Sequence, residues 1–464
     1  MRIIQWFRND LRLRDNTALA AAASRADELL PVFIIDAGLE NRLESPGRRT
    51  YLRRCVDALA HDLDHAGCPL LVVRGDPPTV LAKLVDQTHA DVVTHNRDYS
   101  PFAMRRDRAV ASAVAKAGAR VESFKDRVMF ESREVVTQSG GTFRVFTPYR
   151  NAWLARLSGS PPNTSGLPRL PKRMAVAHPA SSTAALGGAP MEFAAFAAGE
   201  SEAAARLDQF LSGPLASYVE SRDIPGIEGT SKLSPALRFG TISIRTCVAA
   251  VLQVRQSNPR FAAGGGKWLD ELIWRDFYQA LLAEHPRVLT GPFQTQYTNI
   301  PWNDSHEEFE AWCEGRTGYP IVDAAMRQLV QTGWMHNRAR MIVASFLVKD
   351  LLVDWRKGER FFLHHLLDGD PAANNGGWQW AASTGTDAQP YFRIFNPVSQ
   401  GKRFDADGDY VRRFVPELGN VPKRHIHSPW EAPDPPTDYP SPIVDHAERR
   451  VAAIARFAAA RDRK

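Results

Sequence analysis

Cysteine is scarce in this sequence, and the chain also lacks any long apolar run. The four cysteines, Cys55, Cys68, Cys247 and Cys313, are scattered through 464 residues without a CxxC pair. This excludes a disulfide scaffold and argues against a zinc site. No stretch of about 18 apolar residues is present, so we expect no membrane-spanning helix. The first residues, MRIIQWFRNDLRLRD, carry charges at once and are not typical of a secretory signal. We therefore expect reduced thiols, no metal and a cytoplasmic location.

The usual nucleotide-binding motifs are missing as well. No GxGxxG or GxxxxGK[ST] follows the first apolar segment, so an ordinary dinucleotide or nucleoside triphosphate site is not indicated. The net charge is only +6, from 58 Lys and Arg against 52 Asp and Glu. This excess permits a polyanionic partner without requiring one. Tryptophan, by contrast, is abundant, with 11 residues that lie mostly after residue 260.

Hydrophobic periodicity divides the chain into three parts. Val- and Ile-rich runs separated by helical stretches predict five strands, at Ile3–Phe7, Leu30–Ile35, Leu70–Val73, Asp91–Thr94 and Arg120–Phe124. Such runs are typical of a parallel sheet buried on both faces, so we expect a Rossmann-like α/β domain over residues 1–130. Residues 131–197, with a Pro-, Gly- and Ser-rich stretch, are predicted to be an interdomain connector. The pattern is helical from there on and predicts an all-α domain over residues 198–464.

The segment EGTSKLSPALRFG, Glu228–Gly240, opens a predicted helix over Pro235–Gln256. Ser234 is a good N-cap and Pro235 a good first helical residue. Hydroxyl groups and free backbone N–H groups beside a helix N-terminus also bind phosphate well. Helix capping and an anion site are therefore both open interpretations of this segment.

Polar and aromatic side chains share one face of the predicted helix Lys267–Glu284. Glu271, Trp274, Arg275 and Tyr278 follow the spacing i, i+3, i+4 and i+7, so they lie on one side of the helix. A carboxylate, a guanidinium and two aromatic rings could hold a heterocyclic or nucleic-acid ligand. An internal ion pair between Glu271 and Arg275 with aromatic core packing explains the pattern equally well.

Two further segments combine charge, amides and tryptophan. In the predicted helix Met335–Trp355, Asn337 and Met341 form an i, i+4 pair, while Arg340 and Asp350 each need a partner elsewhere. The segment Leu366–Pro397 is polar and Gly-rich yet carries several aromatic residues, which indicates a loop and helix that line a ligand.

Taken together, these segments resemble the DNA photolyase/cryptochrome family. The resemblance begins at WFRNDLRLRDNTAL and becomes dense through GTSKLSPALRFG, ELIWRDFY, GWMHNRARMIVASFLVKDLL and NNGGWQWAASTGTD. Within the family, the chain is most similar to class I photolyases that act on cyclobutane pyrimidine dimers. The implied fold is an N-terminal α/β domain, a connector and a helical domain that holds U-shaped FAD.

The resemblance implies the cofactor residues. The loop Thr230–Ser234 is expected to cradle the FAD diphosphate. Asn374 is expected to face flavin N5, where its amide accepts a hydrogen bond. Arg340 is expected beside the flavin ring, paired with an aspartate. The complete implied FAD set is Tyr218, Thr230, Ser231, Lys232, Leu233, Ser234, Trp268, Glu271, Arg275, Asn337, Arg340, Asp368, Gly369, Asp370 and Asn374.

The resemblance also implies light-driven repair. Excited FADH− passes an electron to a dimer flipped out of the DNA stack, the ring splits, and the electron returns. Glu271, Trp274, Asn337, Met341, Asn374 and Trp380 are the implied catalytic residues. DNA contacts are implied for Trp274, Arg275, Tyr278, Arg338 and Trp380, and Arg338 is expected to bind phosphate. Reduction of oxidised flavin is implied to use Trp378, Trp355 and Trp302, in that order outward.

The second chromophore and the alternative function stay open. Phe102 and Ala103 stand where folate-binding relatives carry Asn and Glu, whereas Asp98, Arg48 and Arg238 fit the deazaflavin type, although Ser100 replaces a Glu. A folate of the 5,10-methenyltetrahydrofolate type, a deazaflavin or no antenna are the choices. A cryptochrome-type blue-light photoreceptor with the same flavin is the alternative function. The expected partner is dimer-containing DNA, with no membrane partner, and the protein is expected to be a monomer.

Overall fold

The computed structural model describes residues 1–36, 38, 45–177, 180–188, 196–387 and 393–462. Two compact units are present. The first contains Met1–Ala216 and Ser231–Pro286, and the second contains Ser217–Thr230 and Arg287–Lys464. The helical region is therefore shared between the two units. Parts of the expected connector, residues 178–179 and 189–195, lie outside the described residues.

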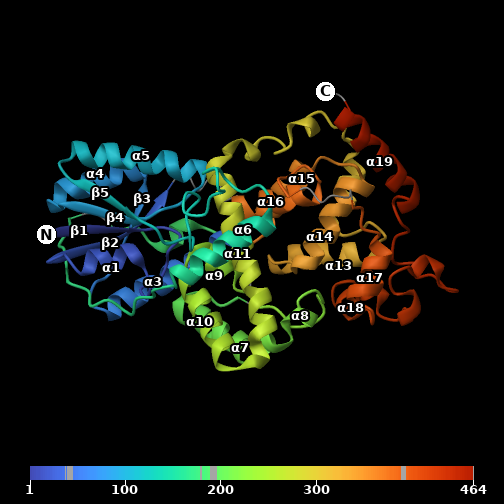
Figure 1. Cartoon of the computed structure of the whole chain (residues 1–464), viewed down its shortest axis with the longest axis horizontal. Coiled ribbons are helices and arrows are strands. Elements are labelled where there is room, and N and C mark those ends of the chain that lie inside the picture. Colours follow the sequence, from blue (N-terminus) through green and yellow to red (C-terminus); the bar gives the residue numbers. More distant parts are fainter. Residues whose placement is uncertain (37, 39–44, 178–179, 189–195, 388–392, 463–464) are drawn as a thin grey trace. The chain divides into compact units, whose positions relative to one another are not determined.

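A parallel sheet is the centre of the first unit (Figure 1). Its strands are β1 (Arg2–Phe7), β2 (Glu28–Asp36), β3 (Leu71–Gly75), β4 (Val92–Asn96) and β5 (Arg120–Phe124), in the order β3-β2-β1-β4-β5. All five predicted strands are thereby confirmed, and the α/β class with them. The strand order reverses between β1 and β4, where Ile3 is paired with Val92. In parallel sheets, this switch point is where ligands usually bind.

Helices cover both faces of this sheet, with α1 (Thr17–Ala23) and α3 (Pro46–His65) on one face and α4 (Pro77–Thr88) and α5 (Pro101–Lys116) on the other (Figure 1). All four begin at polar N-caps, because the side chains of Asn16, Ser45, Asp76 and Ser100 accept hydrogen bonds from backbone N–H groups three residues on. The strand and helix side chains between the layers form a hydrophobic core that includes Ile4, Val32 and Leu84.

The first unit continues with helices α6 (Phe146–Gly159), α7 (Glu200–Ser212), α9 (Ser234–Phe239), α10 (Ile244–Ser257) and α11 (Ala262–Glu284). The prediction of one helix over Pro235–Gln256 is wrong, because the chain turns at Gly240, which has a φ of 66°. A Cβ at Gly240 would lie 2.1 Å from the carbonyl oxygen of Asn9. Only glycine allows that approach together with that backbone conformation. The two-residue strand β6 (Lys172–Arg173), which pairs with β2, was not predicted.

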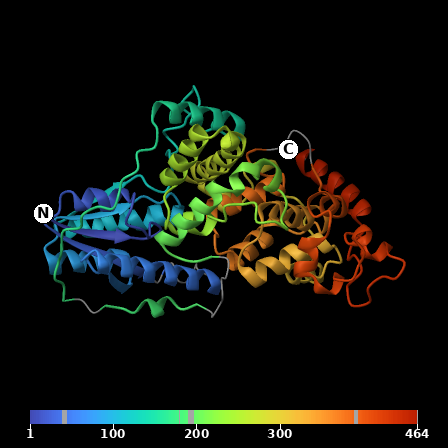
Figure 2. The same cartoon turned by 90° about the horizontal axis from the view of Figure 1, so that it is seen from below.

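The second unit is helical in its described residues. It contains α8 (Tyr218–Ser221), α12 (His306–Glu314), α13 (Pro320–Thr332), α14 (Asn337–Ser345), α15 (Trp355–His365), α16 (Pro371–Ala381), α17 (Pro397–Phe404), α18 (Asp409–Phe414) and α19 (His446–Asp462). Figure 2 shows α19, in red, as a long helix near the C-terminus. Gly333 ends α13 in the left-handed conformation, as predicted.

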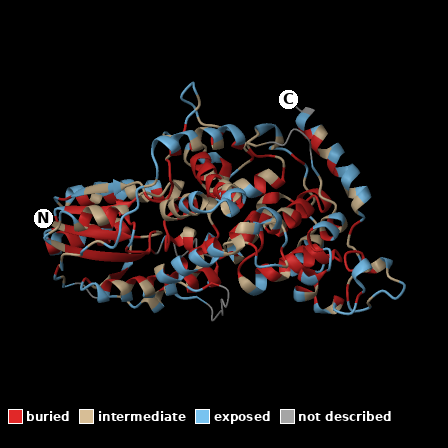
Figure 3. Ribbon diagram, turned by 60° about the horizontal axis from the view of Figure 1, so that its bottom comes forward, coloured by how far each residue is buried: buried red, intermediate tan, exposed pale blue. Residues whose placement is uncertain are grey.

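The predicted helix Met335–Trp355 is also interrupted. A π-helical turn, η6 (Phe346–Asp350), follows α14, and Leu352 then adopts a φ of 57°, so that α15 begins only at Trp355. Residues buried among these helices form the core of this unit, and Figure 3 colours the buried residues of the chain red. Among the described residues, none of the helices is long and apolar enough to cross a membrane.

Candidate functional site

The turn that precedes α9 is fixed from within the first unit. Lys232 adopts a positive φ of 50°, and the Ser231 hydroxyl accepts a hydrogen bond of 3.3 Å from Nε1 of Trp268 on α11. The prediction that Ser234 is the N-cap is wrong, because Ser234 is the first helical residue and Leu233 precedes the helix without a side-chain cap. Thr230 and Tyr218 belong to the second unit.

One face of α11 carries the predicted aromatic residues together. The Trp274 ring stacks on Phe146 of α6, with centroids 3.6 Å apart and an interplanar angle of 4°. Its centroid lies 5.5 Å from that of Tyr278, one turn further along the helix. Glu271, Trp274 and Tyr278 are only partly buried. The helix therefore presents a carboxylate and two held rings on one face, as the spacing predicted.

Arg275 is held by the backbone of the first unit. Its guanidinium donates hydrogen bonds to the carbonyl oxygens of Arg127, at 2.6 Å, and of Leu237 near the end of α9, at 3.4 Å. These contacts join α11 to α9 and orient the turn before α9. The implied direct contacts of Arg275 with cofactor and DNA stay predictions.

The neighbouring Asp276 was not singled out from the sequence. It is fully buried and accepts hydrogen bonds from Nε1 of Trp153 at 3.1 Å and from the backbone N–H of Met129 at 3.0 Å. Burial raises the pKa of Asp276 to about 6, although Arg275 and these donors act in the opposite direction. The sequence does not indicate that Asp276 is a buried hydrogen-bond acceptor, because Trp153 and Met129 lie more than 100 residues away from it in the chain.

In the second unit, Arg340 of α14 and Asp368 form the implied arginine–aspartate pair. Nη2 of Arg340 lies 2.8 Å from Oδ2 of Asp368, and the carboxylate is almost completely buried. Its other oxygen, Oδ1, has no hydrogen-bond partner among the described residues. A buried acceptor of this kind usually has a partner. This unpaired oxygen fits a polar cofactor such as flavin, which offers N–H and hydroxyl donors.

Asp370 and Asn374 are both set by α16. Asp370 caps the helix, because its carboxylate accepts hydrogen bonds from the N–H groups of Ala372 and Ala373. The side-chain nitrogen of Asn374 donates to the carbonyl oxygen of Glu359 at 3.0 Å. This bond turns the amide nitrogen toward α15 and leaves the amide oxygen as the acceptor. That orientation fits the implied role of accepting from flavin N5–H.

Glu359 itself belongs to a buried polar network that sequence reasoning missed. Its Oε1 accepts a hydrogen bond from Asn375 at 3.0 Å, and Asn375 also donates to the carbonyl oxygen of Val288. Gln379, one turn later on α16, donates to the same carbonyl oxygen and to Oδ1 of Asn375. Burial raises the pKa of Glu359 to about 7. The network anchors α16 to α15 and to the segment that begins the second unit's main part.

The implied lesion residues on α14 lie at its start. Asn337 is exposed, and its amide nitrogen lies 4.0 Å from the sulfur of Met341. Arg338 forms an ion pair of 3.0 Å with Asp223, and its guanidinium lies 4.4 Å from the centroid of Phe404. Its implied phosphate contact stays a prediction.

The three implied electron-transfer tryptophans all belong to the second unit. Trp378 and Trp355 are almost fully buried, whereas Trp302 is partly exposed. The backbone N–H of Asn303 donates to the carbonyl oxygen of Leu352 at 2.8 Å, which places the Trp302 segment beside the residues that lead into Trp355. Packing at Gly358 then brings α15 against the Trp378 ring. The structure thus places a partly exposed indole at one end of this path and a buried one at the other.

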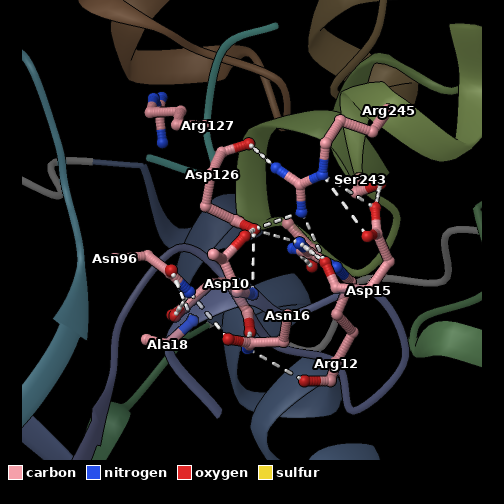
Figure 4. A network of polar contacts seen from close by, with 12 residues as sticks. Asp10, Arg12, Asp15, Asn16, Ala18, Asn96, Asp126, Arg127, Ser243 and Arg245 are labelled. Atoms are coloured by element: carbon pink, nitrogen blue, oxygen red, sulfur yellow. Dashed lines mark hydrogen bonds and ion pairs between the residues drawn. The ribbon is translucent and has the colours of Figure 1, made fainter. Parts of the chain in front are cut away.

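A polar network lies at the carboxyl ends of β1 and β4 in the first unit (Figure 4). Oδ1 of Asp126 forms ion pairs with Nη2 of Arg12, at 2.6 Å, and with Nη2 of Arg245 on α10, at 2.8 Å. Burial opposes ionisation of Asp126, yet the two guanidinium groups lower its pKa. Arg245 also forms an ion pair of 3.2 Å with Asp15. This network joins the sheet to α10.

A small pocket of about 10 Å³, room for about one water molecule, adjoins this network at the strand-order switch point. Its wall contains three arginines and three aspartates, namely Arg8, Arg97, Arg127, Asp10, Asp98 and Asp126, with Asn9 and Asn96. Burial and the nearby Arg127 act in opposite directions on Asp98, and the net effect lowers the pKa of this carboxyl. The hydroxyl of Ser100 caps α5. The pocket is therefore polar but nearly neutral.

Comparison with known proteins gives matches along the whole chain. Residues 3–171 match the model of DNA photolyase, and residues 268–459 match that of the FAD binding domain of DNA photolyase. A deoxyribodipyrimidine photo-lyase of Escherichia coli (strain K12) is 42% identical over 99% of both chains. Among solved structures, a bacterial class III photolyase from Agrobacterium tumefaciens has a TM-score of 0.90 at 39% identity, with 99% of this chain and 97% of that chain covered. A cryptochrome from Synechocystis sp. PCC6803 has a TM-score of 0.88 at 28% identity, with 98% of both chains covered.

Proposed function

This chain belongs to the DNA photolyase family, and from that premise we propose that it repairs cyclobutane pyrimidine dimers in DNA with light. The observation that carries the proposal is the face of α11, where Glu271, Trp274 and Tyr278 stand together on a helix fixed to α6 and α9. A flipped-out dimer of two adjacent pyrimidines can pack against an aromatic wall and offers polar groups to a hydrogen-bonding carboxylate of this kind.

FAD, when bound and reduced, supplies the electron that light transfers to the dimer. The family resemblance assigns its contacts to Ser231–Ser234, Trp268, Tyr218, Thr230, Arg340, Asp368, Asp370 and Asn374. The Arg340–Asp368 pair places a fixed positive charge beside a buried acceptor, which orients a ligand that carries both N–H and C=O groups. The amide of Asn374 accepts a hydrogen bond and gives up no proton readily.

The lesion side of the mechanism is assigned to residues of α11, α14 and α16. Trp274 and Trp380 support the extruded bases by stacking, and Glu271 accepts a hydrogen bond from a dimer base. Asn337 and Met341 complete the contacts with the dimer. Trp302, Trp355 and Trp378 carry electrons inward when the cofactor is oxidised. No step requires a metal ion.

Repair of a defined substrate tests the proposal. Purified protein with reduced FAD is irradiated with oligothymidylate that contains cyclobutane dimers, and recovery of thymine absorbance is followed against a dark control. We expect recovery only in the light and tighter dark binding to damaged than to intact oligonucleotide. The absence of light-dependent recovery, with FAD bound, would contradict the proposal.

A photoreceptor function is the second candidate, because the fold is also similar to that of a cryptochrome at 28% identity. Both functions use light absorbed by a flavin, but only repair needs affinity for damaged DNA. Equal dark affinity for damaged and intact DNA, together with normal flavin photoreduction, would favour the photoreceptor.

The second chromophore is proposed to bind at the carboxyl ends of β1 and β4, beside the polar residues that include Asp98. Ligands of parallel α/β sheets bind at such switch points. The folate and deazaflavin types are both retained. An absorption spectrum of the purified protein distinguishes them, because a second band besides that of flavin identifies the pigment. Substitution of Asp98 by Asn should weaken that band without changing the flavin band.

A further inference from the structure

Trp312 contacts the innermost of the three implied electron donors, although no sequence motif assigns it a role. It lies in the last turn of α12 and is fully buried. Its ring centroid lies 6.1 Å from that of Trp378, with the planes at 70°. Phe362 packs against both rings, with its centroid 5.0 Å from Trp378 and 6.3 Å from Trp312. An electron therefore needs to cross only one direct ring contact to pass between the two indoles.

The surroundings of Trp312 stabilise a positive charge on its ring. Nε1 donates a hydrogen bond of 3.1 Å to the carbonyl oxygen of Val343, and a hydrogen bond accepted from a charged group is stronger than one from the neutral group. The C-terminal end of α12 adds a partial negative charge close by. Nε1 of Trp378, in contrast, has no hydrogen-bond partner in the described part of the chain.

We propose that Trp312 is a fourth redox-active tryptophan, which forms a side branch from Trp378. This inference rests on the proposed function, in which photoexcited oxidised flavin takes one electron from Trp378. Trp312 then gives one electron to the oxidised Trp378, which returns to its neutral form, while Trp312 becomes the cation radical. No bond forms or breaks in this step. The N–H proton stays on Trp312, because a backbone carbonyl is too weak a base to remove it.

The side branch stores the positive charge without letting it reach solvent. Trp312 is fully buried and its ring neighbours are Phe309, Phe361, Phe362 and Trp378, none of which is easier to oxidise than tryptophan. Among the described residues, Trp378 is the one tryptophan in ring contact with Trp312, so charge held on Trp312 returns mainly through Trp378. The path through Trp355 to the partly exposed Trp302 stays the outward route, and Trp312 prolongs the time during which that route can compete with charge recombination.

Blocking the outward route isolates the side branch. In the FAD-loaded Trp355→Phe protein, a flash produces a tryptophan cation radical whose absorbance is followed as it decays. If the carbonyl hydrogen bond favours the charge on Trp312 over Trp378 by about tenfold, recombination is slowed by about the same factor. We therefore expect the radical in Trp355→Phe/Trp312→Phe to decay about ten times faster than in Trp355→Phe. The matched control is Trp355→Phe/Trp430→Phe, which removes a partly buried tryptophan of the same unit without a ring contact to Trp378 among the described residues.

The outcomes separate this proposal from the one on which it rests. Equal decay in Trp355→Phe and Trp355→Phe/Trp312→Phe, with FAD content and circular dichroism unchanged, would overturn the side branch. Loss of the prompt radical in Trp378→Phe is expected, and its persistence would instead refute the assigned electron route. If Trp312→Phe does not fold, Trp312→Tyr tests the same point, because tyrosine is not oxidised readily without a base for its proton. A slow decay retained in the tyrosine variant would also overturn the proposal.

Discussion

Gly358 of α15 allows the helix to pack directly against Trp378, and its replacement by alanine gives a quantitative prediction. A Cβ at this position would lie 2.1 Å from Cη2 of Trp378 and 2.6 Å from Cδ2 of Leu347. Carbon atoms in contact prefer a separation of about 3.5–4.0 Å, so the indole would have to move by about 1.5 Å. Overpacking of this kind costs about 1–3 kcal/mol, and alanine regains about 1 kcal/mol of helix propensity. We expect a net loss of about 1 kcal/mol, together with slower photoreduction of the flavin.

Gly377 on α16 supplies the matched control. It is exposed, and no atom lies within 4 Å of an added Cβ. Gly377→Ala should therefore stabilise the protein by about 0.5–1 kcal/mol without changing photoreduction. Urea unfolding of the two FAD-loaded variants at equal cofactor content, followed by circular dichroism, gives the free energies. If Gly358→Ala were as stable as Gly377→Ala and reduced its flavin as fast as the unchanged protein, the packing argument would be refuted.

Three further predictions follow from single residues. Glu271→Ala should lower the quantum yield of dimer repair several-fold with FAD retained, as measured by thymine recovery per absorbed photon; an unchanged yield would remove the role of the carboxylate. Trp302→Phe should block photoreduction of oxidised flavin but spare repair by chemically reduced enzyme, and continued photoreduction would mean that electrons use another route. Burial raises the pKa of Asp276 from 3.8 to about 6, so the folded state binds the extra proton and its stability should fall by about 2–3 kcal/mol as pH rises from about 4 to above 6. In Asp276→Asn that pH slope should disappear from urea unfolding, and an unaltered slope would contradict the assignment.

The parallel sheet could be predicted from the sequence because its signal is local. The inner strands contain continuous apolar runs, such as Leu29–Ile35 of β2. The ends of the long helices could not be predicted in the same way. The chain turns at Gly240 because the carbonyl oxygen of Asn9 lies against it, and it leaves the helical conformation at Leu352 next to the Asn303 segment. Both breaks depend on residues far away in the sequence.

In the candidate site, too, local features could be predicted from the sequence, whereas contacts between distant residues could not. Helical spacing correctly placed Trp274 and Tyr278 on one face, because side chains one turn apart on a helix are neighbours. The partners that fix the site were not visible in the sequence. Asp276 is bonded to Trp153, and Asn375 to Val288, pairs that only the folded chain brings together. The domain limits at residues 130 and 197 stay predictions, as do the roles taken from the family resemblance.

A single helix interface connects the amide proposed to face flavin with the proposed electron route. On α15, the carbonyl oxygen of Glu359 fixes the side chain of Asn374, and the neighbouring Gly358 contacts Trp378 on the same helix α16. Trp355 is the first residue of α15. Asn374 and Trp378 are four residues apart on α16. The interface between α15 and α16 therefore sets the positions of both relative to Trp355. If these proposed roles are right, a change that separates α15 from α16 alters the position of the Asn374 amide and electron transfer from Trp378 together, and variants of this interface should not change one without the other.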